Sequence, residues 1–320
     1  MDRARIATLT DVGRMLSRVA EFVLVRCPAC DADKPRFRYE KNSLRYDECQ
    51  ECATLYINPR PSADVLAWFY RGSPNYAYWN EFVFPASEAA RRAKIFVPRV
   101  DRLLEICDRY NVPTNALIEI GAGFGTFCAE VNSRDVFKRV VAVEPTPDLA
   151  ETCRKRGVIE SPVEEIRLGE DQLFDVAANF EVIEHLFDPA SFIADMGKLL
   201  RPGGILVIAC PNGKGFDVET LGPLSNTVDH EHLNYFNPAS LSSLIERSGF
   251  ETLESFTPGK LDAELVRTQI LSGAYDASNQ PFLKKLLVED WDLLGQPFQD
   301  FLVQNNLSSN MWIVARKRPA

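Results

Sequence analysis

Apolar residues follow a regular pattern from about residue 116 to the end of the chain. Short apolar runs alternate there with amphipathic stretches of helical period, and the short runs predict strands. The predicted strands are 116–120, 139–143, 176–180, 205–209, 250–256 and 311–315. Strands that alternate with helices at this spacing form a parallel sheet covered on both faces. We therefore predict an α/β fold, doubly wound around a mostly parallel sheet.

The rest of the chain follows a less regular pattern. Residues 8–22 predict a short amphipathic helix, residues 62–110 have a helical pattern with many aromatic side chains, and a mostly helical insertion covers about 260–305. The organisation we expect is an N-terminal helix (1–22), a cysteine-bearing module (23–61), a helical, aromatic-rich linker (62–110), the α/β domain (111–257), and the insertion with the last strand (258–320).

Composition narrows the class of protein. Hydrophobic residues make up 46% of the chain and charged residues 25%, as in ordinary soluble proteins. No apolar run approaches the roughly 20 residues that span a bilayer. The N-terminus also lacks the apolar core of a signal peptide, so we expect a cytoplasmic protein. The net charge of -9 argues against a general affinity for nucleic acid, which needs clustered lysine and arginine.

A glycine-rich turn follows the first predicted strand of the α/β domain. Gly121, Gly123 and Gly125 let the backbone bend sharply and approach a ligand closely. In a doubly wound sheet that ligand lies beyond the carboxyl ends of the strands. A dinucleotide site begins similarly, but Thr126 stands where its fingerprint needs glycine or alanine. Glu119, directly before the turn, is placed to meet a cationic amine rather than a pyrophosphate.

The next predicted strand ends at a second acid. Glu144 lies 23 residues beyond Gly121, where a carboxylate can accept hydrogen bonds from both hydroxyls of a ribose. Together with Glu119 and the glycines, Glu144 describes a nucleoside that carries an amino-acid tail and no phosphates. S-adenosylmethionine fits that description.

These residues resemble the first motif of class I S-adenosylmethionine-dependent methyltransferases, an acid followed by Gly-x-Gly-x-Gly. Residues 174–185 are similar to the fourth strand of that family and the turn after it, and residues 199–204 are similar to the approach to its fifth strand. The resemblance covers about 116–257. It implies a Rossmann-like methyltransferase fold with a seven-stranded sheet.

The resemblance also implies which residues hold the cofactor. Glu119 or nearby backbone would hold the methionine part, Glu144 the ribose, and Val163 with Glu164 the adenine. The family often has an acid before that adenine contact, where this chain has Pro162. The candidate cofactor-binding residues are Glu119, Gly121, Ala122, Gly123, Gly125, Glu144, Pro145, Val163, Glu164, Asn179, Glu181 and His185.

The three histidines all follow predicted strands, on the edge of the sheet where the cofactor is expected. Methyl transfer from a sulfonium depends mostly on proximity and alignment, but a hydroxyl acceptor also needs a base, and histidine has a suitable pKa. We predict His232 or His230 as that base, oriented by Asp229 or Glu231. Two alternatives stay open: one histidine caps the next helix and merely packs, or these four residues bind a metal, although adjacent side chains rarely all point one way.

Four of the eight cysteines form two pairs near the N-terminus. Their spacing is that of a zinc ribbon, in which four thiolates hold a structural zinc ion. The predicted zinc ligands are Cys27, Cys30, Cys49 and Cys52. A segment this short has too little core to fold alone, so the metal would supply much of its stability. Zinc ribbons usually have glycine directly after each pair, where this chain has Asp31 and Ala53.

The sequence leaves three hypotheses for the function. The first is O-methylation of a sugar, nucleotide-linked or part of a glycan, with the ribbon positioning the substrate or packing at an interface. His-Leu-x-Tyr-Phe, at 232–236, is similar to segments of methyltransferases that modify sugars and other small metabolites. The second hypothesis is an RNA or protein methyltransferase guided by the ribbon. The third is a non-catalytic cofactor-binding scaffold. The insertion at 260–305 fits either a lid or a homodimer contact.

Overall fold

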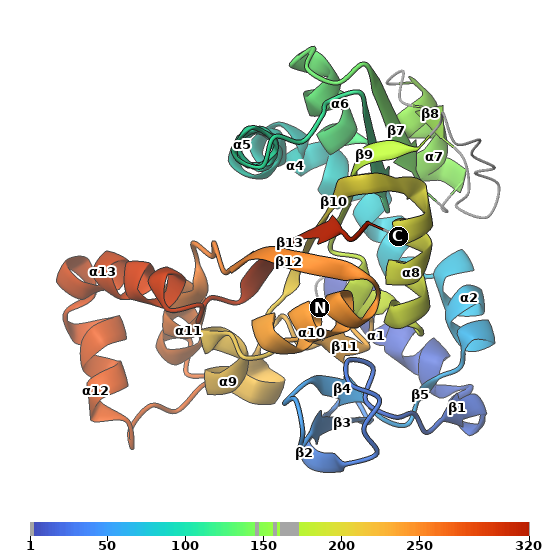
Figure 1. Ribbon diagram of the computed structural model, residues 1–320. Helices are drawn as coiled ribbons and strands as arrows, with labels where there is room; N and C mark the ends of the chain where they lie inside the picture. The colour runs from blue at the N-terminus through green and yellow to red at the C-terminus, as the bar shows by residue number, and fades with distance from the viewer. Residues whose placement is uncertain (1–2, 145–146, 156–158, 161–172, 320) are drawn as a thin grey trace.

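A seven-stranded sheet with the order β12-β13-β10-β9-β6-β7-β8 forms the centre of the molecule (Figure 1). The computed structural model describes residues 3–144, 147–155, 159–160 and 173–319. The strands of the sheet are β6 (Ala116–Ile120), β7 (Arg139–Val143), β8 (Ile159–Glu160), β9 (Phe174–Phe180), β10 (Leu200–Pro211), β12 (Phe250–Phe256) and β13 (Asn310–Lys317). Neighbouring strands from β10 to β8 run parallel, whereas β13 is antiparallel to both of its neighbours. The predicted mostly parallel sheet is confirmed.

Alternate side chains of the sheet enter two hydrophobic cores, one on each face. On β6, Leu117 packs in one core and Ile118 in the other. The core around Leu117 is closed by α5 (Val97–Arg109) and α6 (Thr126–Ser133), and the core around Ile118 by α8 (Pro189–Leu199) and α10 (Pro238–Arg247). Helices on both faces make the sheet doubly wound, as the alternation of strands and helices predicted.

Three strands are longer than their apolar runs predicted. β9, β10 and β13 each extend beyond the predicted limits, by the apolar Phe174, Leu200 and Cys210 and also by residues that are not apolar. Asn310 pairs with Pro211 at one end of β13, and Lys317 pairs with Phe250 at the other. A ladder of backbone hydrogen bonds does not require a buried side chain, so hydrophobicity alone underestimates strand length.

The N-terminal helix begins and ends earlier than the predicted 8–22. α1 (Arg3–Leu16) buries Val12 and Met15, and the chain then makes a single 3-10 turn, η1 (Val19–Glu21). Val19 falls within the predicted range but outside the helix. That side chain is 54% exposed, so the apolar period ends before it.

A second, four-stranded sheet joins the N-terminal module to the main domain. β2 (Pro35–Lys41), β3 (Leu44–Cys49) and β4 (Leu55–Ile57) come from the cysteine-bearing module, and β11 (Asn234–Tyr235) comes from the segment after β10. The order is β11-β4-β3-β2. In Figure 1 this sheet lies below α10, next to the small ribbon of β1 (Phe22–Val23) and β5 (Arg60–Pro61).

The remaining segments are mostly helical, as predicted for 62–110 and 260–305. These elements are α2 (Ala63–Arg71), α3 (Pro74–Tyr78), η2 (Trp79–Val83), α4 (Phe84–Arg91), η3 (Arg92–Phe96), α7 (Pro147–Lys155), η6 (Ile183–His185), α9 (Phe216–Leu221), η7 (Gly222–Leu224), α11 (Asp262–Leu271), α12 (Pro281–Lys284), η8 (Lys285–Glu289) and α13 (Trp291–Gln304). Within the described ranges, no helix has the length and apolar character needed to cross a bilayer.

Candidate active site

The turn between β6 and α6 brings backbone, rather than side chains, to the edge of the sheet. Gly121 has a φ of 79°, and a Cβ added there would lie 2.4 Å from Cγ2 of Val182. Gly123 has a φ of 54°, and a Cβ there would meet no described atom within 4 Å. Left-handed backbone strains residues other than glycine, so the turn is formed as the sequence predicted and faces open space.

A cavity of about 1110 Å³ opens beside this turn. Its walls come from the turn, the end of β9, the helical stretch 84–99, the segment after β10 and the start of the insertion. The lining includes Glu119, Gly121, Ala122, Gly123, Glu181 and His232. Small-molecule sites measure roughly 300–1,000 Å³. The cavity therefore has room for a cofactor and for part of a second reactant.

Glu119 places a buried carboxyl group in the wall of this cavity. It is 3% exposed, and its Oε2 accepts a hydrogen bond from Sγ of Cys128 at 3.1 Å. Burial raises the pKa of Glu119 to about 8, because the charged form loses its hydration. A cationic group that enters the cavity would favour the ionised form, so Glu119 can exchange its proton for a contact with a cation.

Glu144 lies at the end of β7, beside the glycine turn. Its Oε2 accepts a hydrogen bond from the backbone N–H of Gly123 at 2.8 Å. It is not among the described residues that line the large cavity, whereas Ala122 and Glu181 are. The structure therefore brings the carboxylate of Glu144 to the glycine turn, at Gly123, which does line the cavity.

Asn179 on β9 points away from the cavity. Its side chain is fully buried, and its Nδ2 donates to Sδ of Met196 on α8 at 3.3 Å. The structure does not bring this predicted cofactor residue to the site. Three further predicted residues, Pro145, Val163 and Glu164, fall where the structure describes no side chain.

Arg99 on α5 is a functional candidate that the sequence analysis missed. It lines the large cavity, with its guanidinium carbon 4.3 Å from the centre of the Phe180 ring and Nη2 3.9 Å from Oε1 of Glu181. A guanidinium here can pair with a carboxylate. The missed signal is its position between Phe96 and Val100, on the apolar face of an amphipathic helix, where an arginine is unusual.

Another part of the cavity wall comes from the segment of residues 225–236, here called the histidine segment, through Thr227 and His232. β11, at its end, pairs with β4 of the N-terminal module. Lys41 donates from Nζ to the carbonyl of Ser225 at 2.8 Å, and Tyr46 donates from Oη to the carbonyl of Asp229 at 2.6 Å. The N-terminal module therefore fixes the backbone that carries two of the three histidines.

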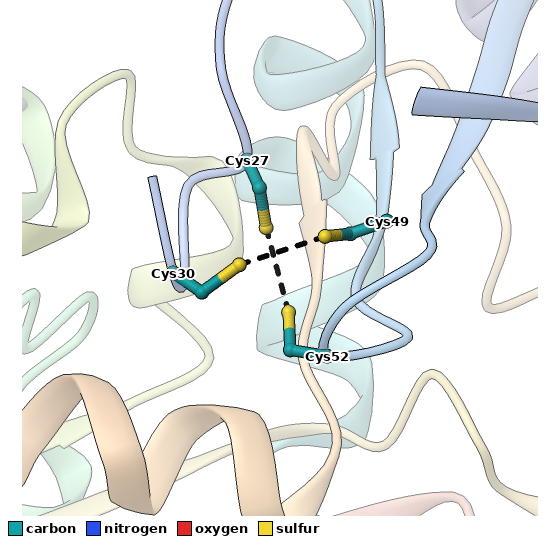
Figure 2. A group of neighbouring side chains, drawn as sticks. All are labelled: Cys27, Cys30, Cys49 and Cys52. Atoms are coloured by element: carbon teal, nitrogen blue, oxygen red, sulfur yellow. Dashed lines mark hydrogen bonds between the residues drawn. The ribbon is translucent and has the colours of Figure 1, made fainter. Parts of the chain in front are cut away.

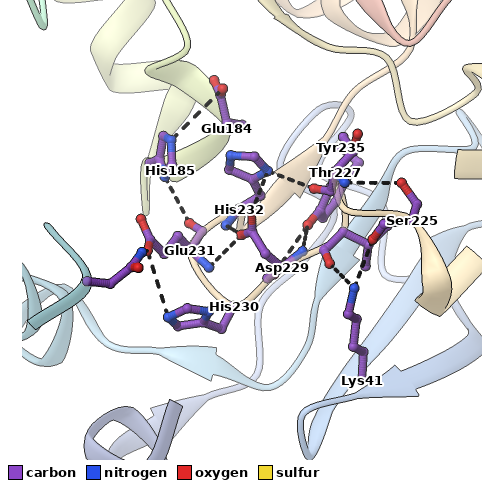
Figure 3. A network of polar contacts seen from close by, with 12 residues as sticks. Lys41, Glu184, His185, Ser225, Thr227, Asp229, His230, Glu231, His232 and Tyr235 are labelled. Carbon is purple, nitrogen blue, oxygen red and sulfur yellow. Dashed lines mark hydrogen bonds and ion pairs between the residues drawn. The ribbon is translucent and has the colours of Figure 1, made fainter. Parts of the chain in front are cut away.

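His232 is the histidine that the structure brings to the large cavity. Its Nδ1 lies 2.9 Å from the carbonyl of Thr227 and 3.4 Å from Oδ2 of Asp229 (Figure 3). A carbonyl can only accept, so Nδ1 carries the hydrogen and Nε2 keeps a free lone pair. The other carboxylate oxygen of Asp229 accepts the backbone N–H groups of Glu231 and His232, at 2.8 and 2.9 Å. Asp229 thus contacts His232 at both its ring and its backbone N–H.

His185 lies behind His232, with the two ring centres 4.7 Å apart. Its Nδ1 faces the carbonyl of Glu231 at 3.1 Å, and burial lowers the pKa of the ring to about 3. Glu184 is buried beside it, and burial raises the pKa of that carboxyl well above its ordinary value. Both groups are therefore uncharged near neutrality, and His185 is a poor base that packs against His232.

His230 faces a second, smaller cavity of about 460 Å³. Asp229, Glu231, Tyr76 and Trp79 also line this cavity. Burial raises the pKa of Glu231 to about 7. His230 and His232 thus line different cavities, so the four residues 229–232 do not all face one ion.

Comparison with known proteins identifies the main domain. The sequence profile of the methyltransferase-domain family matches residues 88–255, more than half of the chain. The chain belongs to the methyltransferase-domain family. A probable S-adenosylmethionine-dependent methyltransferase of Mycolicibacterium smegmatis is 33% identical over 142 residues, which are 42% of this chain and 51% of that relative.

Two further matches have the same character. The ubiquinone biosynthesis O-methyltransferase of Maricaulis maris is 29% identical over 135 residues, 37% of this chain and 52% of that relative. The chain therefore spans about half the length of these curated relatives. The crystal structure of an S-adenosylmethionine-dependent methyltransferase from Clostridium acetobutylicum matches with a TM-score of 0.49 and 10% identity, over 75% of this chain and 99% of that chain.

The methyltransferase domain packs against four converging cysteines, here called the cysteine cluster. The sulfur atoms of Cys27, Cys30, Cys49 and Cys52 all lie within 4.8 Å of one another (Figure 2). Asn237, at the start of α10, donates from Nδ2 to the carbonyl of Cys52 at 2.8 Å. Four sulfur ligands in this arrangement are the donor set that structural zinc prefers.

Both turns of the cysteine cluster have the same backbone geometry. Asp31 donates its N–H to the carbonyl of Cys27, and Ala53 donates to the carbonyl of Cys49, each at 2.9 Å. Their φ angles are 58° and 57°. These are the left-handed positions where zinc ribbons usually have glycine, and the two turns form here with Asp31 and Ala53 instead.

Proposed function

We propose that the chain is an S-adenosylmethionine-dependent methyltransferase that methylates a hydroxyl oxygen of a sugar, either nucleotide-linked or part of a glycan. Membership of the methyltransferase-domain family supports the class of reaction. The observation that carries the acceptor chemistry is His232, which lines the large cavity with one ring nitrogen tied to a carbonyl.

The residues around the glycine turn fit S-adenosylmethionine. The backbone of Gly123 leaves space that a side chain would fill, Glu119 would meet the amine, and Arg99 would meet the carboxylate. Glu144 would accept the ribose hydroxyls from its position beside the turn. The bound cofactor supplies an electrophilic methyl group, and the chain holds the acceptor in line with it.

His232 accepts the proton that the acceptor hydroxyl loses. Nε2 is the nitrogen with the free lone pair, because Nδ1 donates to Thr227. Burial opposes the charge on Asp229, but His232 and its backbone N–H hold the pKa of that carboxyl below its ordinary value. The ionised carboxylate therefore stabilises the imidazolium that forms, as the acid of a catalytic triad does.

The smaller cavity supports a carbohydrate acceptor. Asn75, Asn226 and Glu231 offer hydrogen-bonding groups in its wall, and Tyr76 and Trp79 offer aromatic faces. A sugar ring presents hydroxyls at its edge and C–H groups on its face, which matches this mixture. Phe84 lines both cavities, so an acceptor in the smaller cavity lies next to the cofactor. The name of the Maricaulis maris relative also favours oxygen as the acceptor atom.

The charges of the N-terminal module speak against the RNA hypothesis. Arg36 pairs with Glu48, Arg45 Nε lies 2.8 Å from Oδ1 of Asp47, and Arg38 is shared between Glu48 and Glu219. Basic side chains that are paired with neighbouring acids cannot neutralise phosphates without losing those partners. The net charge of -9 also argues against binding to RNA.

We further propose that the cysteine cluster holds a structural zinc ion whose role is to support the active site. The four sulfurs fit a closed tetrahedral shell. β3 and β4, which leave the cluster, provide the sheet to which the histidine segment is paired. The ribbon is then a positioning module for His232 and the acceptor, rather than a reader of nucleic acid.

The test is a transfer assay with cofactor that carries a labelled methyl group. Nucleotide sugars, glycans and total RNA are offered in parallel. We expect label in a sugar, in a bond stable to mild base, as an ether is. Label in RNA or in protein would overturn the proposed acceptor. Tight cofactor binding without transfer to any acceptor would favour the non-catalytic scaffold.

A further inference from the structure

His230 is a buried histidine without a hydrogen-bond partner. The residue is 1% exposed, and neither ring nitrogen makes a hydrogen bond to any part of the chain that the structure describes. The ring meets Phe69 edge-on, with centres 5.8 Å apart. Nε2 lies 3.8 Å from Oε1 of Glu231, beyond hydrogen-bond distance. Buried polar atoms almost always have hydrogen-bond partners, so an imidazole with none among the described residues requires an explanation.

Two carboxylates from distant parts of the chain face this ring. Asp11 comes from α1 and Glu231 from the histidine segment. A carboxylate oxygen of each acid and a ring nitrogen of His230 all lie within 4.8 Å of one another. Oδ1 of Asp11 also makes no hydrogen bond to a described residue, and its cationic neighbour is Nη1 of Arg14 at 3.7 Å. Two acids and one imidazole thus converge, and two of the three residues, His230 and Glu231, line the smaller cavity.

A single residue holds both carboxylates in this arrangement. Asn75 donates its backbone N–H to Oδ2 of Asp11 at 3.0 Å and its Nδ2 to Oε1 of Glu231 at 2.9 Å. Ser73 gives Asp11 a further hydrogen bond, and Thr8 donates to Oδ1 of Asn75 at 3.2 Å. Partners that fix the ligands from behind are typical of metal sites, where they orient the coordinating atoms.

We propose that Asp11, His230 and Glu231 form a binding site for a divalent first-row cation. One imidazole nitrogen and two carboxylate oxygens are a donor set suited to ions such as Mn²⁺, Fe²⁺ or Zn²⁺. Ligands about 2.1 Å from a common ion lie up to ~4 Å apart, so side-chain movements of less than an ångström close the site. The cation takes up one ring nitrogen of His230 and Oδ1 of Asp11, neither of which has a hydrogen bond to a described residue, and it balances the charge of the two acids.

The position of the site indicates its use. His230 and Glu231 line the smaller cavity together with Asn75 and Tyr76, so a bound cation has open coordination positions toward that cavity. Vicinal hydroxyls or a phosphate of an acceptor can occupy them. The cation site goes beyond the proposed methyl transfer. Cation binding is measured without cofactor or acceptor, so a negative result for the cation site does not depend on whether the methyl transfer proposal is right.

The structure contains a second mixed cluster, which serves as the internal control. Glu184, His185 and His232 also bring ligand-type atoms within 4.8 Å of one another. There, however, Nδ1 of each histidine is already bonded to a backbone carbonyl, and His232 is assigned to proton transfer. Glu184→Gln therefore removes a buried carboxylate of the same kind without touching the proposed site.

The experiment titrates the full chain, with its zinc in place, with Mn²⁺ alone and follows the free ion by electron paramagnetic resonance. Thiolates compete poorly for Mn²⁺, so the cysteine cluster does not interfere. We expect one Mn²⁺ per chain, binding weakened about tenfold or more in Asp11→Asn and in Glu231→Gln, and unchanged binding in Glu184→Gln. Bound Mn²⁺ should also raise the melting temperature of the wild type but not of Asp11→Asn.

Three results would overturn the proposal. The first is no binding at millimolar Mn²⁺ in a wild type that is folded by circular dichroism. The second is binding that both Asp11→Asn and Glu231→Gln leave unchanged. The third is binding that only Glu184→Gln abolishes, because the ion would then occupy the other cluster.

Discussion

The glycine turn and the histidine segment line the same cavity, but they are built in different ways. The turn and Glu119 lie within one strand–turn–helix unit, so a short stretch of sequence contains the whole arrangement. The histidine segment has its shape because Lys41, Tyr46 and β4, far away in the sequence, hold its backbone. Cofactor binding should therefore survive changes that destroy proton transfer, and the reverse should also hold.

The largest expected effect is the loss of methyl transfer when His232 is replaced. Replacing His232 with Ala should lower methyl transfer about 10²- to 10⁴-fold, because the acceptor loses its base. Cofactor affinity should stay within about twofold, since Glu119 and the glycine turn are untouched. The assay is transfer of labelled methyl group beside calorimetric titration of the cofactor.

Added imidazole distinguishes a base from a structural residue at this position. A small molecule can fill the space left by the ring, so imidazole should restore part of the transfer in His232→Ala. Asp229→Asn, which keeps an acceptor for the backbone N–H groups, should lose less activity. Full transfer in His232→Ala would contradict the assignment.

The second prediction tests the proposed support of the histidine segment by the N-terminal module. Cys49→Ser removes one sulfur of the cysteine cluster, so zinc content should fall below one equivalent. β4 then loses its anchor, and a misplaced His232 should lower transfer about 100-fold while cofactor binding persists. Cys107→Ser, a buried thiol outside the cluster, is the control. Normal transfer by zinc-free protein would break the proposed link.

The third prediction concerns the pH dependence of cofactor binding. Burial raises the pKa of Glu119 to about 8, so below that pH the carboxyl must release a proton to pair with a cationic amine. Affinity should therefore rise with pH, by up to tenfold per unit, and level off above about pH 8. Glu119→Gln should bind the cofactor about tenfold more weakly at that pH and lack this rise.

Calorimetric titrations from about pH 6 to about pH 8 give the slope of cofactor affinity against pH for the wild type and for Glu119→Gln. The amine of the cofactor titrates equally in both proteins, so the difference between their slopes reports Glu119 alone. Identical slopes would show that another group releases the proton.

The smallest expected effect is a change in the free energy of unfolding when an alanine beside the cysteine cluster is replaced by glycine. Ala53 has a φ of 57°, so Ala53→Gly should relieve the strain of a left-handed residue and raise the free energy of unfolding by up to about 1 kcal/mol. Ala29 is 1% exposed and does not have a positive φ. Ala29→Gly should therefore destabilise the protein, and the same sign for both variants in urea unfolding would refute the argument.

Features that depend on local pattern could be predicted from the sequence. The strands alternate with helices, the glycines stand where the backbone is left-handed, and the cysteine spacing brings four sulfurs together. Each of these depends on residues close in sequence, where period, backbone preference and ligand spacing act directly.

Features that depend on distant pairing could not be predicted. Nothing in the pattern around Asp11 indicates that it meets His230, because a single acid on an amphipathic helix has no period of its own. Arg99 was missed because an arginine in a helix normally faces water, and Asn179 was expected at the cofactor although its side chain bonds Met196 in the core. Side-chain direction at the end of a strand depends on packing, which local sequence does not contain.

The central claim is that cofactor binding and proton transfer reside on two separately built walls of one cavity. The most direct test measures cofactor affinity and the transfer rate at saturating cofactor in the wild type, Glu119→Gln and His232→Ala. We expect opposite patterns in the two variants. Glu119→Gln weakens cofactor affinity about tenfold and largely keeps the transfer rate, while His232→Ala keeps cofactor affinity and loses the transfer rate. The same pattern in both variants would contradict it.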